Sequence, residues 1–337
     1  MINVAINGFG RIGRMIFRAA WNERNINIVA INDITDTKTL AYLLKHDSLQ
    51  GPFKEDVGFT EDSIVISRKK IKVLAEKDPT KLPWKQLKVD LVIESTGRFT
   101  TPQDAAQHIS AGAQKVLLSA PFKGDNSLPP SAISLVMGVN DTVYDHKEHF
   151  VVSNASCTTN CVAPILKVIQ DNVGIKYCFF STIHAYTADQ HLVDGPHKDL
   201  RRARAAALNI IPTSSGADVA VQQALPKLKG KIRGAAFRVP VACGSVTDFT
   251  IATEKETTPE YINKLFQLAA RTKMSGLIQY SEEDLVSSDI IGNSFSAIFD
   301  AKLTKVLGKN VIKVVAWYDN EWGYSCRMVD MIKLMMR

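Results

Sequence analysis

The sequence predicts an α/β protein in which a doubly wound parallel sheet is followed by a domain with a large, mostly antiparallel sheet. The first half alternates short β-rich runs with amphipathic stretches, a pattern typical of parallel sheets. After Cys157 the strand candidates are longer and fewer helices separate them, which favours antiparallel pairing. This change of pattern predicts a domain boundary near residue 155.

The β-rich runs of the first half are bounded by Gly, Asn, Asp and Ser, and the stretches between them carry apolar residues at helical spacing. The expected strands there are Asn3–Asn7, Asn27–Asn32, Lys70–Ala75, Leu91–Glu94, Lys115–Ser119 and Val151–Ser153. The expected helices there are Arg11–Asn22, Thr37–Leu44 and Pro102–Ala111. In the second half the expected strands are Lys176–His184, Val246–Thr253, Ser294–Ala301 and Val311–Tyr318. The expected helices there are Cys157–Asp171, Ala217–Ala224, Pro259–Thr272 and Trp322–Met336.

Length and composition agree with a globular enzyme of about two domains. The chain has 337 residues, of which 45% are hydrophobic and 22% charged. No apolar run reaches the ~18 residues of a membrane helix, and the N-terminus lacks the features of a signal peptide. The five cysteines form no C-x-x-C pair. We therefore expect a protein of the reducing cytoplasm, without a membrane partner.

The net charge of +7 favours anionic partners. Phosphorylated metabolites, nucleotides and nucleic acids all belong to that class. The basic residues are mostly scattered, with one dense cluster at Arg201-Arg202-Ala203-Arg204. No aromatic residues interleave with a basic stripe, so nucleic-acid binding is not expected to be the primary role.

A dinucleotide motif opens the chain. Gly8, Gly10 and Gly13 form G-x-G-x-x-G between the first strand and the first helix. These glycines allow a tight turn, close approach of the backbone to a pyrophosphate, and helix–strand packing. The pyrophosphate would lie at the helix N-terminus. Asp33 ends the second strand 20 residues after Gly13 (33 − 13 = 20), where a carboxylate binds the ribose hydroxyls and favours NAD over NADP.

The run Ser153-Asn154-Ala155-Ser156-Cys157-Thr158-Thr159-Asn160-Cys161 places a thiol at the start of a predicted helix. The helix dipole there lowers the pKa of a thiol and favours the thiolate. Cys161 lies one turn further on. The two thiols have no accompanying Cys or His at ligand spacing, so no metal is expected and Cys161 is interpreted as a small buried residue.

Among the seven histidines, His184 is the candidate base. It ends a predicted strand, where it can reach a helix-start thiol and form an ion pair with it. The other six histidines are expected in polar loops or exposed segments: His46, His108, His146, His149, His191 and His197.

Anion-binding candidates follow in the second half. They are Thr187, the Thr213-Ser214-Ser215-Gly216 turn before the helix that begins at Ala217, and Arg238. Taken singly, each also has an ordinary structural interpretation, as a helix cap or a surface ion pair.

Together these blocks resemble the phosphorylating glyceraldehyde-3-phosphate dehydrogenase family, of bacterial or glycolytic type, along essentially the whole chain. The most specific match is S-N-A-S-C-T-T-N-C at 153–161. Further matching blocks are 5–14, 184–190, 199–212, 238–240 and 317–324.

The resemblance implies a Rossmann domain over 1–156, a catalytic domain over 157–318, and a C-terminal helix (319–337) that packs back on the first domain. It implies oxidation of glyceraldehyde 3-phosphate to 1,3-bisphosphoglycerate with NAD and inorganic phosphate, through a thiohemiacetal and a thioester on Cys157. His184 would be the general base. The loop from Tyr186 to Arg204 would line a neighbour's cofactor site in a homotetramer.

The resemblance also assigns binding residues. The substrate phosphate would be held by Thr187 and Arg238. The inorganic phosphate would be held by Ser156, Thr158, Ser215 and Gly216. The cofactor contacts would be Arg11, Ile12, Asp33, Lys77, Thr96, Ser119, Asn320 and Tyr324.

Alternatives from other classes remain open. Erythrose-4-phosphate dehydrogenase is a relative with the same Cys and His, but that family tends to lose Thr187 and the Ser-Gly turn, which are present here. A Cys–His hydrolase would leave the dinucleotide motif without a purpose.

One departure from the family concerns the cofactor preference. Asp194-Gly195-Pro196 replaces a Leu-Pro common in strictly NAD-dependent members, so the preference for NAD depends mainly on Asp33.

Overall fold

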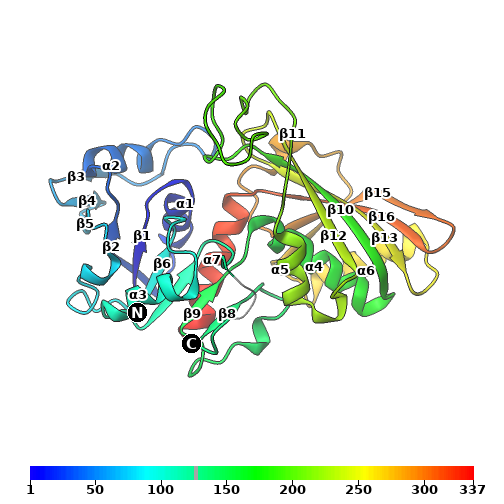
Figure 1. The fold of residues 1–337 in the computed structure, drawn as a ribbon, viewed down its shortest axis with the longest axis horizontal. Helices are drawn as coiled ribbons and strands as arrows, with labels where there is room; N and C mark the ends of the chain where they lie inside the picture. Colours follow the sequence, from blue (N-terminus) through cyan, green and yellow to red (C-terminus); the bar gives the residue numbers. More distant parts are fainter. Residues whose placement is uncertain (125–127) are drawn as a thin grey trace. The chain divides into compact units, whose positions relative to one another are not determined.

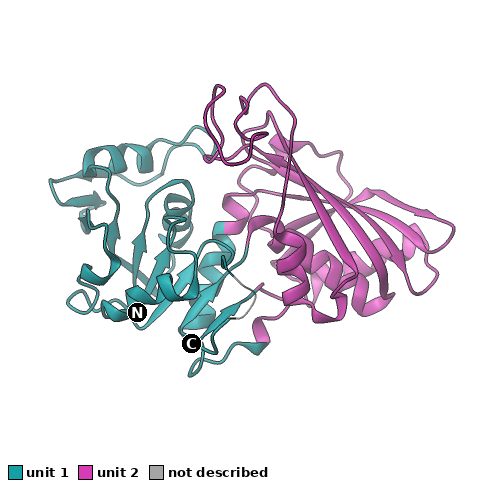
Figure 2. Cartoon of the chain, viewed as in Figure 1, with its two compact units in different colours: residues 1–135, 143–155, 325–337 teal, residues 136–142, 156–324 magenta. Residues whose placement is uncertain are grey.

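The computed structural model of the chain describes residues 1–124 and 128–337. Contacts within the chain divide it into two compact units (Figure 2). Unit 1 consists of residues 1–135, 143–155 and 325–337, and unit 2 of residues 136–142 and 156–324. The last thirteen residues therefore belong to the same unit as the N-terminal strand.

Unit 1 contains a sheet with the strand order β3-β4-β5-β2-β1-β6-β7-β9-β8 (Figure 1). Its strands are β1 (Ile2–Asn7), β2 (Ile26–Asn32), β3 (Val57–Phe59), β4 (Ser63–Ile66), β5 (Lys69–Leu74), β6 (Leu91–Glu94), β7 (Lys115–Leu118), β8 (Ala132–Ser134) and β9 (Val151–Ser153). Pairing is parallel from β5 through β2, β1, β6, β7 and β9 to β8. β4 pairs antiparallel with both β3 and β5. β5 matches the expected strand Lys70–Ala75, whereas β3, β4 and β8 were not predicted.

Helices cover both faces of this sheet, as a doubly wound fold requires. They are α1 (Arg11–Ala20), α2 (Thr37–Lys45) and α3 (Pro102–Ser110), and the unit also holds most of α7 (Trp322–Met335). Gly13 of α1 lies against Ile6, whereas Ala105 of α3 packs with Val116 on the opposite face. The helix starts follow the sequence, since Asp36 and Thr101 accept hydrogen bonds as N-caps of α2 and α3.

Unit 2 contains a mixed sheet with the strand order β11-β12-β10-β13-β16-β15-β14. Its strands are β10 (Ile175–Ala185), β11 (Ile211–Thr213), β12 (Ile232–Val239), β13 (Ser245–Thr253), β14 (Ile278–Ser281), β15 (Ala297–Leu307) and β16 (Val311–Tyr318). Most neighbours are antiparallel, as predicted, but β10 pairs with β12 in parallel and β14 with β15 in parallel. The strands β11, β12 and β14 were not predicted from the sequence.

One contact between β10 and β12 explains why a glycine interrupts a strand. Gly234 lies opposite Phe180, and a Cβ at Gly234 would meet the Phe180 ring at 2.2 Å. Further along the same pair of strands, His184 lies opposite Arg238. The parallel register therefore brings a candidate base and a candidate anion-binding residue side by side.

The helices of unit 2 are α4 (Cys157–Asn172), α5 (Ala217–Ala224) and α6 (Pro259–Arg271). They lie along one face of the sheet (Figure 1). Alternate residues of β10, among them Cys178, Phe180 and Thr182, are buried on that face, while Tyr177 and Phe179 are exposed on the other. The core of this unit therefore lies between the sheet and its helices.

Short 3-10 turns complete the chain at Pro79–Lys81, Asp141–Val143, Pro226–Leu228 and Ser287–Ile290. Within residues 1–124 and 128–337, none of the helices is long and apolar enough to cross a membrane.

The structure corrects the expectation for one histidine. His46 and His146 are exposed, as predicted, but His108 on α3 is fully buried, with 0% of its surface accessible. Its burial is possible because both ring nitrogens meet polar partners, Trp84 and Glu94.

Candidate active site

The predicted dinucleotide turn forms a close-packed cradle at the start of α1. A Cβ at Gly8 would meet the backbone nitrogen of Thr96 at 2.6 Å, and a Cβ at Gly13 would meet the Gly8 carbonyl oxygen at 2.2 Å. Gly8 also has a positive φ of 90°. A Cβ at Gly10, in contrast, would point into open space, since the described residues beyond its chain neighbours place no atom within 4 Å of it. Gly10 therefore lets a ligand approach the backbone, while Gly8 and Gly13 shape the turn.

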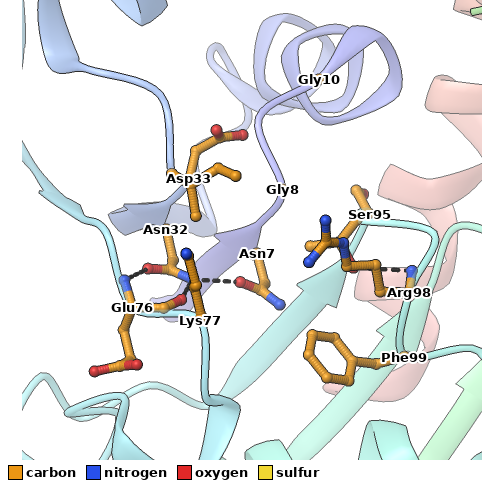
Figure 3. A pocket seen from close by; sticks show the side chains of 12 residues that line it. Asn7, Gly8, Gly10, Asn32, Asp33, Glu76, Lys77, Ser95, Arg98 and Phe99 are labelled. Carbon is orange, nitrogen blue, oxygen red and sulfur yellow. Dashed lines mark hydrogen bonds between the residues drawn. The ribbon is translucent and has the colours of Figure 1, made fainter.

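A pocket of about 220 Å³ lies beside this cradle, at the carboxyl ends of β1, β2 and β6 (Figure 3). This is the edge where parallel α/β sheets bind ligands. The lining residues are Asn7, Gly8, Gly10, Asn32, Asp33, Ile34, Glu76, Lys77, Ser95, Thr96, Arg98 and Phe99. Five of the predicted cofactor residues are among them: Gly8, Gly10, Asp33, Lys77 and Thr96.

Backbone hydrogen bonds hold Asp33 in place in this pocket. Its Oδ2 accepts from Phe9 N at 2.7 Å and its Oδ1 accepts from Thr35 N at 2.9 Å. Each carboxylate oxygen has a second lone pair, so Asp33 retains the capacity to accept from hydroxyl groups.

Other predicted cofactor residues lie outside the pocket wall. Arg11, Ile12, Gly13 and Ser119 are not among the described residues that line it. Arg11 forms an ion pair with the buried carboxylate of Asp47. The Ser119 hydroxyl donates to the carbonyl oxygen of Glu94 at 3.3 Å.

In unit 2, Cys157 is the first residue of α4. The N-cap is Ser156, whose hydroxyl oxygen accepts from Thr159 N at 3.1 Å. Ala155, directly before the cap, has the left-handed φ of 51°, a conformation costly for a residue with a Cβ. This turn leads the chain from β9 into α4. It leaves Cys157 partly exposed, and Cys161 is fully buried, as predicted for that residue.

Cys157, His184 and Arg238 form a compact group. The Cys157 Sγ lies 3.4 Å from His184 Nε2. On the other side of the ring, His184 Nδ1 lies 2.7 Å from the carbonyl oxygen of Ala185 and 2.6 Å from Arg238 Nη1. Arg238 Nη1 also donates to Ala185 O at 3.0 Å. The sequence predicted the Cys–His contact, and the structure adds the arginine directly behind the imidazole.

Burial affects the protonation equilibria of this group. Burial raises the pKa of the Cys157 thiol above its usual value, although the positive charge of Arg238 and hydrogen bonding to Thr158 oppose this effect. Burial, followed by the charge of Arg238, lowers the pKa of His184 to about 3. Desolvation of both groups opposes the expected thiolate–imidazolium pair, while the helix dipole and the 3.4 Å contact favour it, so the pair stays a prediction.

The predicted anion-binding hydroxyls already have partners within the chain. Ser156 Oγ lies 2.8 Å from Thr159 Oγ1, and Thr158 Oγ1 lies 3.0 Å from the hydroxyl of Tyr318. The Thr187 hydroxyl donates to Asp189 Oδ1, and Ser215 Oγ accepts from Ala217 N at 3.2 Å.

Gly216 is the N-cap of α5 and supplies no side chain to it. Asn320 is buried, and its Oδ1 accepts from Ser245 Oγ at 2.9 Å and Gly244 N at 3.2 Å. Tyr324 is also buried, in the first turn of α7. The structure thus fixes the orientation of the Asn320 amide through unit 2 itself.

Sequence reasoning missed two features around Thr187 and Cys157. Arg202 pairs with Asp189 at 2.8 Å and donates to Thr213 Oγ1 at 2.7 Å. Burial alone would raise the pKa of Asp189, but the hydrogen bond from Thr187 and the charge of Arg202 hold it below its usual value. The second missed residue, Tyr318, bridges Thr158 to Thr182. It stands in a block that the resemblance did identify, so proximity to that motif was the available signal.

Comparison with known proteins agrees with both units. The family model of the glyceraldehyde 3-phosphate dehydrogenase NAD binding domain matches residues 2–102, and that of the C-terminal domain matches residues 156–320. Over 335 residues the chain is 51% identical to glyceraldehyde-3-phosphate dehydrogenase 1 of Bacillus cereus, covering 99% of this chain and 98% of that protein. The chain belongs to the glyceraldehyde-3-phosphate dehydrogenase family.

Two further relatives of this family show the same extent of similarity. The glyceraldehyde-3-phosphate dehydrogenase of Streptomyces coelicolor is 52% identical over 332 residues, covering 98% of this chain and 97% of that protein. That of Geobacillus stearothermophilus is 51% identical over 330 residues, with the same coverage. The resemblance proposed from the motifs and the fold class implied by it are thereby confirmed.

NAD is the cofactor of this glyceraldehyde-3-phosphate dehydrogenase family member, and the residues of unit 1 fit it. The N-cap of α1 is Gly10, which has no side chain to cap the helix, so a pyrophosphate can take that place. Among the described residues, the buried Ser95 Oγ on the pocket wall has no hydrogen-bond partner. Within the same residues, no cluster of three His, Cys, Asp or Glu side chains could hold a metal ion.

Proposed function

We propose that the protein oxidises glyceraldehyde 3-phosphate to 1,3-bisphosphoglycerate with NAD and inorganic phosphate. The observation that carries the proposal is the 3.4 Å contact between Cys157 Sγ and His184 Nε2 at the N-terminus of α4. Relatives that are 51 to 52% identical to this chain, and that match it over nearly their whole length, are named after this activity.

In the first step Cys157 adds to the aldehyde carbon. His184 Nε2 takes the thiol proton while the S–C bond forms and returns it to the carbonyl oxygen, which gives a thiohemiacetal. This role needs the tautomer in which Nδ1–H donates to Ala185 O, because Nε2 then accepts. Arg238 Nη1, which can only donate, lies 2.6 Å from Nδ1, so Arg238 must turn from the imidazole toward the substrate phosphate for this tautomer to form. A general base must be neutral before it accepts a proton, and burial with the charge of Arg238 keeps His184 neutral. A phosphate bound to Arg238 would offset that charge and raise the pKa of His184 toward the range in which proton transfer is efficient.

NAD, when bound, supplies the hydride acceptor that converts the thiohemiacetal to a thioester. His184 takes the hydroxyl proton in that conversion. Inorganic phosphate then attacks the thioester carbon, the C–S bond breaks, and Cys157 regains its proton as the acyl phosphate leaves. The thioester retains the free energy of oxidation that hydrolysis would lose.

The anionic groups need cationic and hydroxyl partners. Arg238 and Thr187 are assigned to the substrate phosphate, and Ser156, Thr158, Ser215 and Gly216 to the inorganic phosphate. Arg238 is mostly buried, which strengthens its interaction with an anion. The hydroxyls now bonded to Thr159, Tyr318 and Asp189 can rotate toward a bound phosphate, since a hydroxyl both donates and accepts.

In unit 1, the pocket residues Gly8, Gly10, Asp33, Lys77 and Thr96 are assigned to NAD. The assignment extends to Arg11, Ile12, Gly13 and Ser119 of the same unit, and to Asn320 and Tyr324. Asp33 supports NAD over NADP, because a carboxylate at the ribose position repels a 2′-phosphate.

We further propose that the protein works as a cytoplasmic homotetramer. Large apolar side chains are exposed on unit 2, where assembly would bury them. They include Tyr177 and Phe179 of β10 and, in or after the loop 186–210, Leu192, Leu200, Leu208 and Ile210. Light scattering after gel filtration should give about four times the chain mass of 37.2 kDa.

The decisive experiment measures NADH formation at 340 nm from glyceraldehyde 3-phosphate and NAD, with and without inorganic phosphate. Erythrose 4-phosphate and NADP are tested in parallel. Sustained turnover only with phosphate supports the proposal. Turnover that does not depend on phosphate, or a preference for erythrose 4-phosphate, would overturn it.

A further inference from the structure

A chain of buried polar side chains runs behind the wall of the unit 1 pocket. Three neighbouring parallel strands end in register, with Asn7 of β1 opposite Asn32 of β2 and opposite Glu94 of β6. All three side chains are at least 95% buried. His108 of α3 and the Trp84 indole lie on the same face of the sheet and are fully buried.

The hydrogen bonds among these groups fix the tautomer of His108. An indole N–H only donates, and Trp84 Nε1 lies 3.0 Å from His108 Nδ1, so Nδ1 accepts. The ring proton is then on Nε2, which lies 3.1 Å from Glu94 Oε2. His108 is thereby a neutral donor to a buried carboxylate, held from both sides.

The carboxylate of Glu94 accepts hydrogen bonds from residues behind the pocket and from residues that line it. Its Oε2 accepts from His108 and from Asn7 Nδ2, the latter at 2.6 Å. Its Oε1 accepts from the backbone N–H of Thr96 at 2.8 Å and from the Thr96 hydroxyl at 2.5 Å. A buried carboxylate with four donors is held firmly, and its position determines those of Asn7 and Thr96.

Asn7 and Thr96 belong to the pocket, whereas Glu94 and His108 stand behind it. From Asn7 the chain of polar groups continues to Asn32, whose Nδ2 donates to Asn7 Oδ1 at 2.7 Å (Figure 3). Asn32 in turn bonds the backbone of Glu76, a further lining residue, at 2.8 and 2.9 Å. The backbone nitrogen of Thr96 is also the atom that a Cβ at Gly8 would meet at the shortest distance, 2.6 Å.

We propose that His108 is a positioning residue for NAD binding, which acts through Glu94 on Asn7 and Thr96. Without His108 the carboxylate loses one of its four donors and the Trp84 N–H loses its acceptor. Glu94 and the turn at Thr96 then shift away from the geometry that fits the ligand. The inference rests on the proposed function, because it concerns the pocket assigned to NAD.

The test compares His108→Phe with His108→Gln in the full-length protein. Phenylalanine fills a similar volume and removes both hydrogen bonds, while the glutamine amide can still donate to Glu94. NAD affinity is measured by titration calorimetry. We expect His108→Phe to weaken NAD binding about 10-fold and His108→Gln to restore it to within about 2-fold of the wild type.

Two readouts separate positioning from general damage. The KM for NAD should rise about 10-fold in His108→Phe with kcat changed less than about 2-fold, and the alkylation rate of Cys157 in unit 2 should not change. Ala105→Gly is the matched control, since it destabilises α3 but removes only a methyl group from an apolar cluster and no hydrogen bond of the chain of polar groups. If Ala105→Gly weakens NAD binding as much as His108→Phe, helix stability is the cause and the proposal is wrong.

A double mutant tests the route through Glu94. If His108 acts through Thr96, the losses of NAD affinity in His108→Phe and Thr96→Val should be clearly less than additive in the double variant. Additive losses would refute this route. Wild-type protein that binds no NAD would refute the proposed function, whereas normal wild-type binding with an unaffected His108→Phe variant would refute the positioning role alone.

Discussion

Arg238 Nη1 lies 2.6 Å from His184 Nδ1, on the side of the imidazole opposite the thiol of Cys157. The guanidinium charge therefore acts on both members of the reactive pair. It lowers the pKa of His184 and opposes the rise that burial causes in the pKa of Cys157. An anion bound to Arg238 would weaken both effects, which couples substrate binding to the protonation of the catalytic pair.

The role of Cys157 predicts a selective loss in Cys157→Ser. A serine hydroxyl is a far weaker nucleophile than a thiol, so NADH formation should fall by more than about 10³-fold. NAD affinity, measured by calorimetry, should remain within about 2-fold because the cradle of unit 1 is unchanged. The matched control is Cys161→Ser, at a buried position one turn further on, which should retain most of its activity. Full activity of Cys157→Ser would rule out the thioester route.

The pKa directions predict how thiol reactivity depends on pH. His184 has a pKa of about 3 and does not titrate between about pH 6 and pH 9. The thiolate fraction of Cys157, whose pKa is raised, grows about 10-fold per pH unit over this range. Alkylation by iodoacetamide in the ligand-free enzyme should therefore accelerate continuously with pH. Peptide mass spectrometry localises the label at Cys157, and a plateau near neutral pH would instead show a preformed ion pair.

Arg238→Met should separate substrate binding from folding. The loss of a charged partner should raise the KM for glyceraldehyde 3-phosphate about 10-fold or more. The pKa of His184 should rise, because the charge that lowers it is removed. Arg233→Met on the same strand is the control, since Arg233 is exposed and should leave the KM unchanged. Equal effects of the two substitutions would contradict the assignment of Arg238.

The glycine cradle predicts two different outcomes for two alanine substitutions. Gly13→Ala places a Cβ 2.2 Å from Gly8 O, so both the melting temperature and NAD affinity should fall. Gly10→Ala meets open space within the chain, so only NAD affinity should fall, by about 10-fold. Gly58→Ala, also in open space but on β3, should change neither. Unchanged NAD affinity in Gly10→Ala would show that the pyrophosphate does not bind at this turn.

Elements with a strong local pattern were predicted from the sequence almost to the residue. β6, β9, β16 and α5 have the expected bounds, because apolar and β-branched runs there are bounded by polar or glycine-containing turns. β12 was missed since Gly234, Ala235 and Ala236 have little strand propensity. Its strand conformation comes from pairing with β10, a contact between segments far apart in the sequence.

The same limit applies to the candidate site. The motifs indicated Cys157 and His184, whose contact the structure shows, because the chemistry of each residue type is local. The burial of His108 could not be predicted, since its partners Trp84 and Glu94 come from other segments and leave no periodic signal in α3. The effect of burial on the Cys157 pKa could not be predicted either, because desolvation depends on the whole surrounding fold.

The parallel pairing of β10 with β12 also makes the enzymatic activity depend on the correct register of these two strands. His184 stands opposite Arg238, and Phe180 stands opposite Gly234, in one and the same alignment. A slip by one residue would turn Arg238 to the far side of the sheet and force the Phe180 ring against a side chain. A misaligned chain would be compact and inert. The specific activity recovered after refolding therefore measures the fraction of molecules in which β10 and β12 have the correct register. Light scattering and circular dichroism would not distinguish these molecules from misaligned ones.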